Sequence, residues 1–333
     1  MDRISDLPTH VVEKILEHLP MADGARTCVL SKIWRYKWEE APQLIFDRNF
    51  VSDLQKRRGQ ISESRIMKTI LYEVLLAHSG SVNKFTLSIP QLESCPEIDR
   101  IIRYLAKKGV HHFKLIMLSG GFHKLPSHMF LYEQLQSFKL YSCILEIPSS
   151  FQGFNKLVSL EFQKVMINPN FFDLFISKCP QLEKLVLNGC ICEEPCSINI
   201  NSPSLTQFNY TGAYKAVSFI NSPLLQIVSI YYSSGEVLPS YPAKLCCLSE
   251  MIAGLPMIQC LSIDNYFLKA INPSCRSFPV ALNQLRILEA FDLCLWDKKE
   301  MESLFGLIRS SPNLEMVKLE MNPCLQTVEN PIL

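Results

Sequence analysis

Cysteine is the residue type whose chemistry has to be considered first, because the chain of 333 residues holds 13 of them. Thiolates bind zinc and act as nucleophiles. Three cysteines fall close together in the stretch NGCICEEPC, at Cys190, Cys192 and Cys196. Structural zinc sites combine two closely spaced Cys or Cys/His pairs, and no second pair with such spacing occurs in this sequence. The spacing therefore does not predict a metal site.

The adjacent pair His111-His112 is the second group that could bind a metal or transfer protons. It lies in a segment with the alternation of a strand, where neighbouring side chains face opposite sides, so the two rings do not form a chelating pair. We expect one surface and one core histidine. The sequence also lacks the motifs GxxxxGK[ST], GxSxG and HExxH. The chain is therefore predicted to be non-catalytic and to need no cofactor.

Composition and charge favour an ordered protein of the nucleus or cytoplasm. Apolar residues make up 48% of the chain, and the formal net charge of +1 is small for a protein that binds nucleic-acid phosphates. The run Lys56-Arg57-Arg58 is predicted to be a solvated loop. The start MDRISDLPTHVV has no apolar signal core, and no apolar run approaches the ~20 residues that cross a membrane. An odd cysteine count in a chain of this length favours reduced thiols.

A six-residue frame, apolar-x-x-apolar-x-apolar, recurs ten times and organises most of the chain. The last two apolar positions would lie on one face of a strand, and stacked copies would share one core. Most steps between copies fall within the 20–29 residues of leucine-rich repeats, and the longer steps indicate loop insertions. The frames are VNKFTL from Val82, VHHFKL from Val110, LQSFKL from Leu135, LVSLEF from Leu157, LEKLVL from Leu182, LTQFNY from Leu205, LQIVSI from Leu225, IQCLSI from Ile258, LEAFDL from Leu288 and LEMVKL from Leu314.

The segments between the frames differ in character. EIDRIIRYLAKKG, which has apolar residues at helical spacing and Gly109 as its stop, is predicted to be a helix, as are FFDLFISKCP and EMESLFGLIRSSP. The spacers after Leu187 and Tyr210 contain Asn, Ser and Gly and are expected to be irregular. Charge in residues 48–67 favours a loop, whereas IMKTILYEVLLAH is predicted to be a helix that covers the apolar end of the stack.

The first 47 residues lie outside the repeat frame and have the pattern of three short helices. LPTHVVEKILEHLP carries one apolar face, and MADGARTCVL is a shorter candidate. Ser31 is a suitable N-cap for a third helix, in which Trp34 and Trp38 lie on one side. Three helices of this length form a marginal core that usually needs a partner or a neighbouring domain. The tryptophans would face such a partner or pack internally against the first repeat.

The order of residues in this segment resembles the plant form of the F-box, over residues 2–47. The resemblance rests on Asp6-Leu7-Pro8, Ile15-Leu16, Leu19-Pro20, Asp23, Arg26, Val29-Leu30-Ser31 and Trp34-Arg35-Tyr36-Lys37-Trp38. The later phrases HSGSVNKFTLSI, KLYSCIL and LIRSSPNLE resemble the repeats of plant F-box/leucine-rich-repeat proteins, and the last of them resembles an FBD region.

This resemblance implies an α/β fold class in three parts. Residues 1–47 would form a small three-helix F-box, and residues 48–81 a linker with a solenoid-capping helix. Residues 82–333 would form an irregular leucine-rich-repeat solenoid, with parallel strands inside, helices and loops outside, and FBD-like last repeats.

The family further implies a substrate-recognition subunit of an SCF-type (cullin–RING) ubiquitin ligase. The F-box would dock on a Skp-family linker, which connects it to cullin and RING subunits, and the repeats would hold an unknown protein substrate. No nucleic acid or membrane partner is expected. Tryptophan and arginine are enriched among interface hot spots. The expected docking positions are Leu7, Pro8, Ile15, Leu16, Leu19, Val29, Ser31, Trp34, Arg35 and Trp38.

Two other functions are compatible with the same scaffold. A ligand-dependent sensor would need clustered cations on the inner face of the repeats, whereas the variable frame positions hold a mixed set with no clear anion pocket. That set is Lys84, Lys114, Lys139, Glu161, Glu183 and Lys184. An interaction scaffold without ligase activity would have lost its docking elements, and the LP, SK and WR elements are intact here. The ligase adaptor is therefore the favoured prediction.

Overall fold

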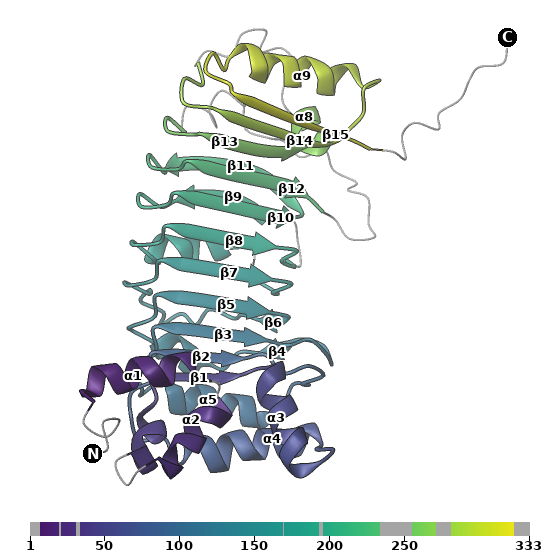
Figure 1. Cartoon of the computed structure of the whole chain (residues 1–333). Helices are drawn as coiled ribbons and strands as arrows, with labels where there is room; N and C mark the ends of the chain where they lie inside the picture. The colour runs from purple at the N-terminus through teal and green to yellow at the C-terminus, as the bar shows by residue number, and fades with distance from the viewer. Residues whose placement is uncertain are drawn as a thin grey trace, which may run out of the picture. The chain divides into compact units, whose positions relative to one another are not determined.

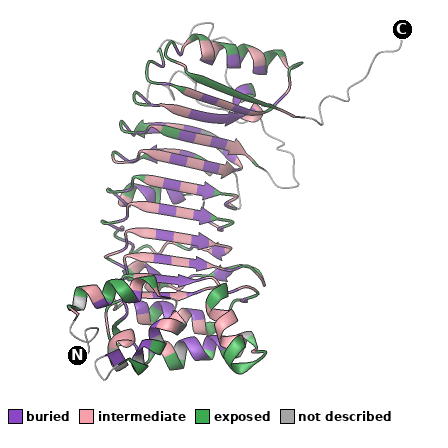
Figure 2. Cartoon of the chain, viewed as in Figure 1, coloured by how far each residue is buried: buried purple, intermediate pink, exposed green. Residues whose placement is uncertain are grey.

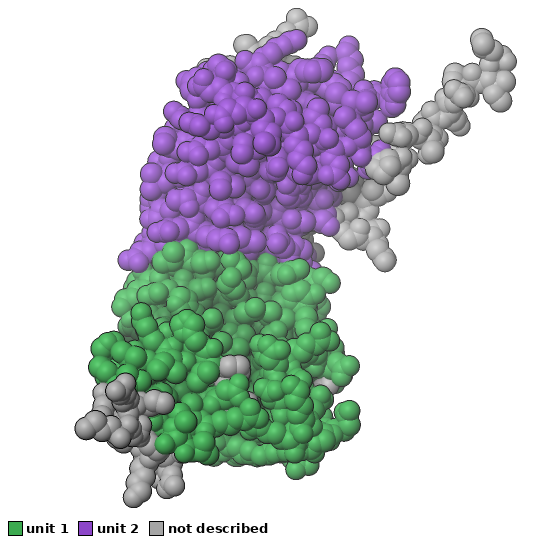
Figure 3. All heavy atoms as spheres, in the orientation of Figure 1, with its two compact units in different colours: residues 1–166 green, residues 167–333 purple. Residues whose placement is uncertain are grey.

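The computed structural model describes residues 7–19, 21–30, 34–168, 170–192, 196–233, 255–270 and 281–322. The chain divides into two compact units, Met1–Met166 (unit 1) and Ile167–Leu333 (unit 2), which Figure 3 distinguishes by colour. Each unit has parallel strands and buried apolar residues of its own. None of the described helices is long and apolar enough to span a membrane.

Unit 1 begins with short helices. They are α1 (Thr9–His18), α2 (Met21–Arg26) and two 3₁₀ helices, η1 (Thr27–Val29) and η2 (Trp34–Glu40). The third predicted helix is thus a 3₁₀ helix, and its predicted N-cap, Ser31, lies outside the described residues. Val12 and Leu16 lie four residues apart on α1 and pack with Trp34 in a small buried core. One of the two tryptophans therefore has an internal role.

Parallel strands in the order β1, β2, β3, β5 and β7 form the sheet of unit 1 (Figure 1). Their bounds are Gln43–Phe46, Lys84–Leu87, His112–Ile116, Ser137–Tyr141 and Ser159–Gln163. Figure 2 shows buried and less buried residues alternating along these strands. On the buried face, aromatic rings follow one another from strand to strand, with centroids 5.6 Å apart for Phe85 and Phe113 and 5.2 Å for Phe138 and Phe162. Burial of this apolar surface is the main stabilising contribution of the frame.

Strand β1 lies within residues 1–47, which were expected to stand outside the repeat frame. It pairs in parallel with β2, so that Leu44 lies opposite Phe85 and Phe46 opposite Leu87. Ala41, Leu44 and Phe46 have the spacing of one more copy of the frame, and all three side chains are buried. The sequence pattern was missed because alanine occupies the first apolar position.

The segment after β1 is helical where its charge favoured a loop. Helix α3 (Arg48–Arg58) begins at the N-cap Asp47, whose carboxylate accepts hydrogen bonds from the backbone N–H groups of Asn49 and Phe50. The predicted loop Lys56-Arg57-Arg58 is its last turn, where cations interact favourably with the helix dipole. Gly59 ends the helix with a φ of 75°.

The other helical segments of unit 1 agree more closely with the sequence pattern. IMKTILYEVLLAH forms the end of α4 (Glu63–Lys68) and a π-helix, η3 (Thr69–Leu75). Helix α5 (Pro96–Leu105) buries the apolar residues at helical spacing, which are Ile98, Ile101, Ile102 and Leu105. A further 3₁₀ helix, η4 (Ser127–Leu131), and the short parallel pair β4 (His123–Lys124) and β6 (Cys143–Ile144) complete the unit.

Unit 2 repeats the same plan with parallel strands in the order β8, β10, β12, β13, β14 and β15. Their bounds are Lys184–Asn188, Gln207–Gly212, Ile227–Tyr232, Cys260–Asp264, Ile287–Leu293 and Met316–Met321. The helical segments are α6 (Phe171–Leu174), the 3₁₀ helix η5 (Ile176–Lys178), α8 (Asn265–Ala270) and α9 (Lys298–Arg309). The predicted helices in FFDLFISKCP and EMESLFGLIRSSP are thus confirmed, the first as a short α-helix followed by a 3₁₀ turn.

The spacers after Leu187 and Tyr210 are not irregular, contrary to expectation. They form strands β9 (Cys196–Asn201) and β11 (Tyr214–Asn221), which pair in parallel as a second sheet. Buried apolar residues, such as Ile198 and Val217, alternate with less buried polar ones. Alternation of this kind is the signal for a strand, but it lacks the spacing of the main frame.

Two further expectations are corrected in unit 2. The register pairs Leu261 with Leu288 and Ile263 with Ala290, so the frame of β14 begins at Leu285 and not at Leu288. Ala290 occupies the last apolar position of the frame, and its small side chain conceals that position in the sequence. The larger Phe291 and Leu293 fit the sequence pattern better, which displaced the expected frame by three residues. In addition, Cys192 is disulfide-bonded, which contradicts the expectation of reduced thiols at this position.

Candidate functional site

The N-terminal helices divide the ten expected docking positions into core and surface residues. Leu16 and Trp34 are buried, and Trp34 is only 1% exposed. Leu7 and Leu19 are partly buried and pack against the same core. These four residues therefore hold the helices together, and substituting them would disturb a partner surface indirectly, through the fold.

The surface group consists of Pro8, Ile15 and Val29, of which Val29 is the most open, at 82% exposure. Leu30, which the sequence analysis did not include among the docking positions, is 51% exposed. Two consecutive apolar residues are therefore exposed to solvent at the end of η1, where the hydrophobic effect favours a covering surface.

The remaining docking positions have mixed outcomes. Trp38 is half-buried and lines a small pocket together with Met21, Phe50 and Val74. Ser31 lies outside the described residues, and the backbone of Arg35 is described but its side chain is not. The structure therefore places Trp38 between the N-terminal helices and α3.

Hydrogen bonds tie the N-terminal helices to the first strands of unit 1. The N–H groups of Ser79 and Gly80 donate to the carbonyl of Glu39, at 2.9 and 3.3 Å. The ring Nε2 of buried His78 lies 2.9 Å from the carbonyl oxygen of Ala41. Burial lowers the pKa of His78, although this hydrogen bond acts in the opposite direction. The junction is therefore built for a neutral imidazole.

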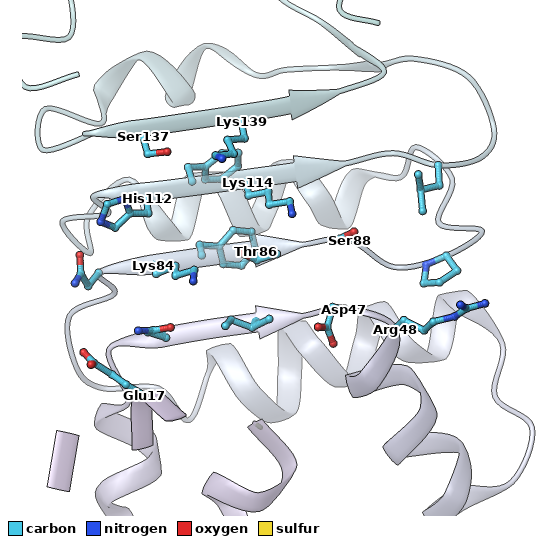
Figure 4. A pocket seen from close by; sticks show the side chains of 17 residues that line it. Glu17, Asp47, Arg48, Lys84, Thr86, Ser88, His112, Lys114, Ser137 and Lys139 are labelled. Carbon is cyan, nitrogen blue, oxygen red and sulfur yellow. The ribbon is translucent and has the colours of Figure 1, made fainter. Parts of the chain in front are cut away.

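The open face of the unit 1 sheet carries a second candidate surface, a pocket of about 1070 Å³. Strand register aligns equivalent frame positions: Lys84 lies opposite His112, and Thr86, Lys114 and Lys139 follow one another on β2, β3 and β5. Figure 4 shows these side chains on one face of the strands. Arg48, Asp47 and Glu17 also line the pocket.

The lysines of this pocket differ in their partners. Lys139 forms an ion pair with Glu161, at 2.8 Å. Within the part of the chain that the structure describes, neither Lys84 nor Lys114 has a carboxylate within ion-pair distance, and both are half-buried. Burial, followed by the charges of His111 and Lys84, lowers the pKa of His112. Strand pairing thus places Lys84 and Lys114, which have no such carboxylate partner, on adjacent strands of unit 1.

The register between parallel strands explains how these lysines come to lie on one face of the sheet. Parallel neighbours stack about 4.8 Å apart, so frame positions that are far apart in sequence become adjacent in space. Lys84, Lys114 and Lys139 belong to unit 1, whereas Glu183 and Lys184 belong to unit 2. Glu161 also belongs to unit 1 and pairs with Lys139, so the set in unit 1 consists of three lysines and one glutamate.

The histidines do not follow the expected division into one surface and one core residue, because His111 and His112 are both half-buried. Elsewhere, His123 is buried and links Ser94, whose Oγ is 2.9 Å from Nδ1, to Asp99, whose Oδ1 is 3.3 Å from Nε2. This polar chain connects α5 and the turn before it to β4. Among the described residues, no group of three or more His, Cys, Asp or Glu side chains is placed to hold a metal ion.

Comparison with known proteins identifies the families to which the N-terminal helices and the repeats are similar. Residues 4–42 match the F-box domain, and residues 98–319 match the family described as "FBD-associated F-box protein At5g56370, LRR repeats". The chain is 31% identical to the F-box/FBD/LRR-repeat protein At1g13570 of Arabidopsis thaliana, over 97% of this chain and 76% of that protein. It is 28% identical to the putative F-box/FBD/LRR-repeat protein At4g13965 of the same plant, over 100% of this chain and 78% of that protein.

The matched segments coincide with the elements of the structure. The F-box match ends just before β1, and the repeat match begins within α5 and ends within β15. The resemblance noted from the sequence and the expected fold class are thereby confirmed. This chain belongs to the plant family of FBD-associated F-box proteins with leucine-rich repeats.

Proposed function

We propose that the chain is the substrate-recognition subunit of an SCF-type ubiquitin ligase. Its F-box and leucine-rich repeats are domains of protein-interaction adaptors, which are generally non-catalytic. In the proposal, the F-box docks on a Skp-family linker that leads to cullin and RING subunits, and the repeats hold a protein substrate in the nucleus or cytoplasm.

The observation that carries the proposal is the exposed apolar pair Val29 and Leu30 beside the compact core of the N-terminal helices. Both side chains are more than half exposed, and Ile15 on α1 is 37% exposed. An apolar surface on a rigid support is the usual starting point of a docking site, because little conformational entropy is lost on binding. Core residues such as Trp34 supply that support.

The test is titration calorimetry of the full chain with a plant Skp-family linker. The affinity of the wild type is compared with that of the double variant Val29→Asp, Leu30→Asp. We expect the variant to bind at least about tenfold more weakly, equivalent to ~1.4 kcal/mol, because buried carboxylates would have no partner. Leu131→Asp is the matched control, since Leu131 is 61% exposed in η4, away from the F-box helices. Circular dichroism establishes that each variant is folded.

Deletion of the F-box helices is a second test, and strand β1 determines where the shortened chain must begin. A truncation after residue 47 would remove β1 and uncover Phe85, whereas a chain that begins at Ala41 keeps the strand. Loss of binding by this shorter chain and by the double variant would support the adaptor role. A folded wild-type chain that does not bind the linker would refute it and leave an interaction scaffold.

A further inference from the structure

The pocket on the open face of the unit 1 sheet contains cations that the fold itself does not use. Lys84 and Lys114 are half-buried, and no described carboxylate lies within ion-pair distance of either ammonium group. Cations that have no carboxylate partner create a local positive potential that attracts anionic groups. Two such cations on adjacent strands therefore indicate a binding site for an anionic group.

The surroundings of the two lysines define the shape of that group. The pocket extends over β1, β2, β3 and β5, and the register places Thr86 beside Lys114 and His112 beside Lys84. Ser88 and Ser137 add hydroxyl groups to its lining. The pocket therefore extends over four strands and carries hydrogen-bond donors along its length, which suits an extended chain better than a compact ligand.

We propose that this pocket binds an acidic, extended peptide segment of a protein partner, with Lys84 and Lys114 pairing with its carboxylates. Alternate side chains of an extended peptide lie about 7 Å apart on one face. The flexible lysines of neighbouring strands can reach carboxylates at that spacing. The assignment of the peptide to a ubiquitination substrate rests on the proposed function, whereas peptide binding itself does not.

Charge on the rim gives the peptide an orientation. Asp47 is engaged at its own helix, where its carboxylate accepts two backbone N–H groups. Glu17 is the other acidic residue of the lining. Repulsion by these two carboxylates favours placement of the acidic side chains toward β3 and β5, where Lys114 and Lys139 lie. Lys139 already pairs with Glu161 and contributes less free charge.

The same features disfavour nucleic acid as the occupant. Proteins that bind single-stranded nucleic acid combine cations with exposed aromatic rings on which bases stack. Phe85 and Phe113 belong to this part of the sheet, but each is only 1% exposed, so neither ring is available for a base to stack on.

The test uses fluorescence anisotropy of the full chain with a labelled peptide of alternating Glu and Ser. The matched probe replaces every Glu by Gln, and a single-stranded DNA of equal charge is the third probe. We expect the Glu peptide alone to bind, with an affinity that falls as salt is raised, because the Debye length shortens from ~10 Å at about 0.1 M to ~3 Å at about 1 M.

The variant Lys84→Ala, Lys114→Ala should weaken binding of the Glu peptide about tenfold or more, since each removes one ion pair. The matched control is Lys184→Ala, Lys318→Ala, because these lysines occupy the same frame positions in unit 2 and should leave the affinity unchanged. Equal binding of the Gln peptide, tighter binding of DNA, no binding by the folded wild type, or no effect of the first variant would overturn the proposal.

The measurement needs no linker protein, so it separates the two proposals. Peptide binding without linker binding would leave the pocket assignment intact and remove the ligase role. Linker binding without peptide binding would do the reverse.

Discussion

The two units bury the same frame, except in β15 of unit 2, where Val317 and Leu319 are 41% and 42% exposed, but they present different chemistry on their open faces. In unit 1, Lys84, Lys114 and Lys139 stand on neighbouring strands. In unit 2, the register instead aligns an apolar row, in which Ile227 and Met316 are 38% and 55% exposed. The row consists of Ile227, Cys260, Ile287 and Met316. Core packing fixes only every second residue of a strand, so the intervening positions can diverge without loss of the fold.

Aromatic residues sharpen the contrast. The ring series of unit 1, which runs through Phe85, Phe113 and Phe138, lies on the buried face. Unit 2 also has an aromatic contact between half-buried residues of its strands, with the rings of Tyr231 and Phe291 5.5 Å apart. Lys318 lies over Phe291, 4.9 Å from the ring centroid. One face therefore suits anions, and the other suits apolar or aromatic groups.

The largest expected effect comes from breaking what the units share. Phe138→Ala in unit 1 and Phe208→Ala in unit 2 each remove a fully buried ring. Each should lower the free energy of unfolding by about 3–5 kcal/mol, through lost burial and a residual cavity. Lys114→Ala and Ser229→Ala, on the open faces, should change it by about 0.5 kcal/mol or less. Urea denaturation measures all four, and an open-face variant as costly as a core variant would contradict the division of faces.

The shared frame is also the part that could be predicted from sequence. Large apolar residues at fixed spacing identified the strands, but Ala41 and Ala290 concealed one strand and displaced another. A small side chain fits a core position as well as a large one does, and only its neighbours show that the position is buried. The alternation in β9 and β11 was visible but lay outside the frame that was being sought.

The candidate sites could be predicted less completely. The F-box pattern identified the correct segment, yet it could not separate Trp34, which is buried, from Val29, which is exposed. That separation depends on how α1 packs against η2. The lysine pocket depends on register between strands more than twenty residues apart, which no local pattern contains.

Buried titratable groups should give the two units opposite pH dependence. The pKa of His78 in unit 1 lies below its ordinary value, chiefly because of burial. Below pH ~6.5 the histidine of the unfolded chain binds a proton that the buried histidine does not. The free energy of unfolding of unit 1 should therefore fall as the pH falls.

Asp264 in unit 2 behaves in the opposite sense. Burial raises its pKa to about 6, although the N–H groups of Phe267 and Tyr232 donate to its carboxylate. Between pH ~4 and about 6 the folded state binds more protons, so stability falls as the pH rises, by roughly 3 kcal/mol in all.

Amide hydrogen exchange, read peptide by peptide, follows each unit across this range. The variant His78→Gln should remove the dependence in unit 1 and leave that of unit 2, and Asp264→Asn should do the reverse. Parallel changes in both units in either variant would show that these groups do not account for the difference.

A smaller effect is expected in unit 1 where the N-terminal helices meet the segment before β2, at the hydrogen bonds from Ser79 and Gly80 to Glu39. A Cβ atom on Gly80 would lie 2.9 Å from the Cα of Glu40, which is backbone and cannot move aside alone. Gly80→Ala should therefore lower the free energy of unfolding by about 1–3 kcal/mol. Gly24→Ala is the control of opposite sign, because the added carbon meets only Leu16, at 3.8 Å. It should stabilise α2 by about 0.5–1 kcal/mol. Thermal unfolding of both variants measures the difference, and equal shifts would rule out a close-packed junction.

The smallest expected effect tests how each open face holds its lysines. Lys139 pairs with Glu161 at 2.8 Å, with side chains 41% and 27% exposed, whereas Lys318 lies over the ring of Phe291. Double-mutant cycles to alanine should give about 0.2–1 kcal/mol for the ion pair and about 0.5–1 kcal/mol for the cation–π pair.

Salt separates the two interactions. At about 1 M salt the Debye length falls to ~3 Å, so the coupling energy of Lys139 and Glu161 should approach zero. The attraction between Lys318 and Phe291 comes from the ring quadrupole and acts only at short range, so it is screened less and most of its coupling energy should survive. Equal losses in both cycles would mean that the open face of unit 2 holds its lysine by charge alone, and the chemical contrast between the two faces would then reduce to their apolar rows.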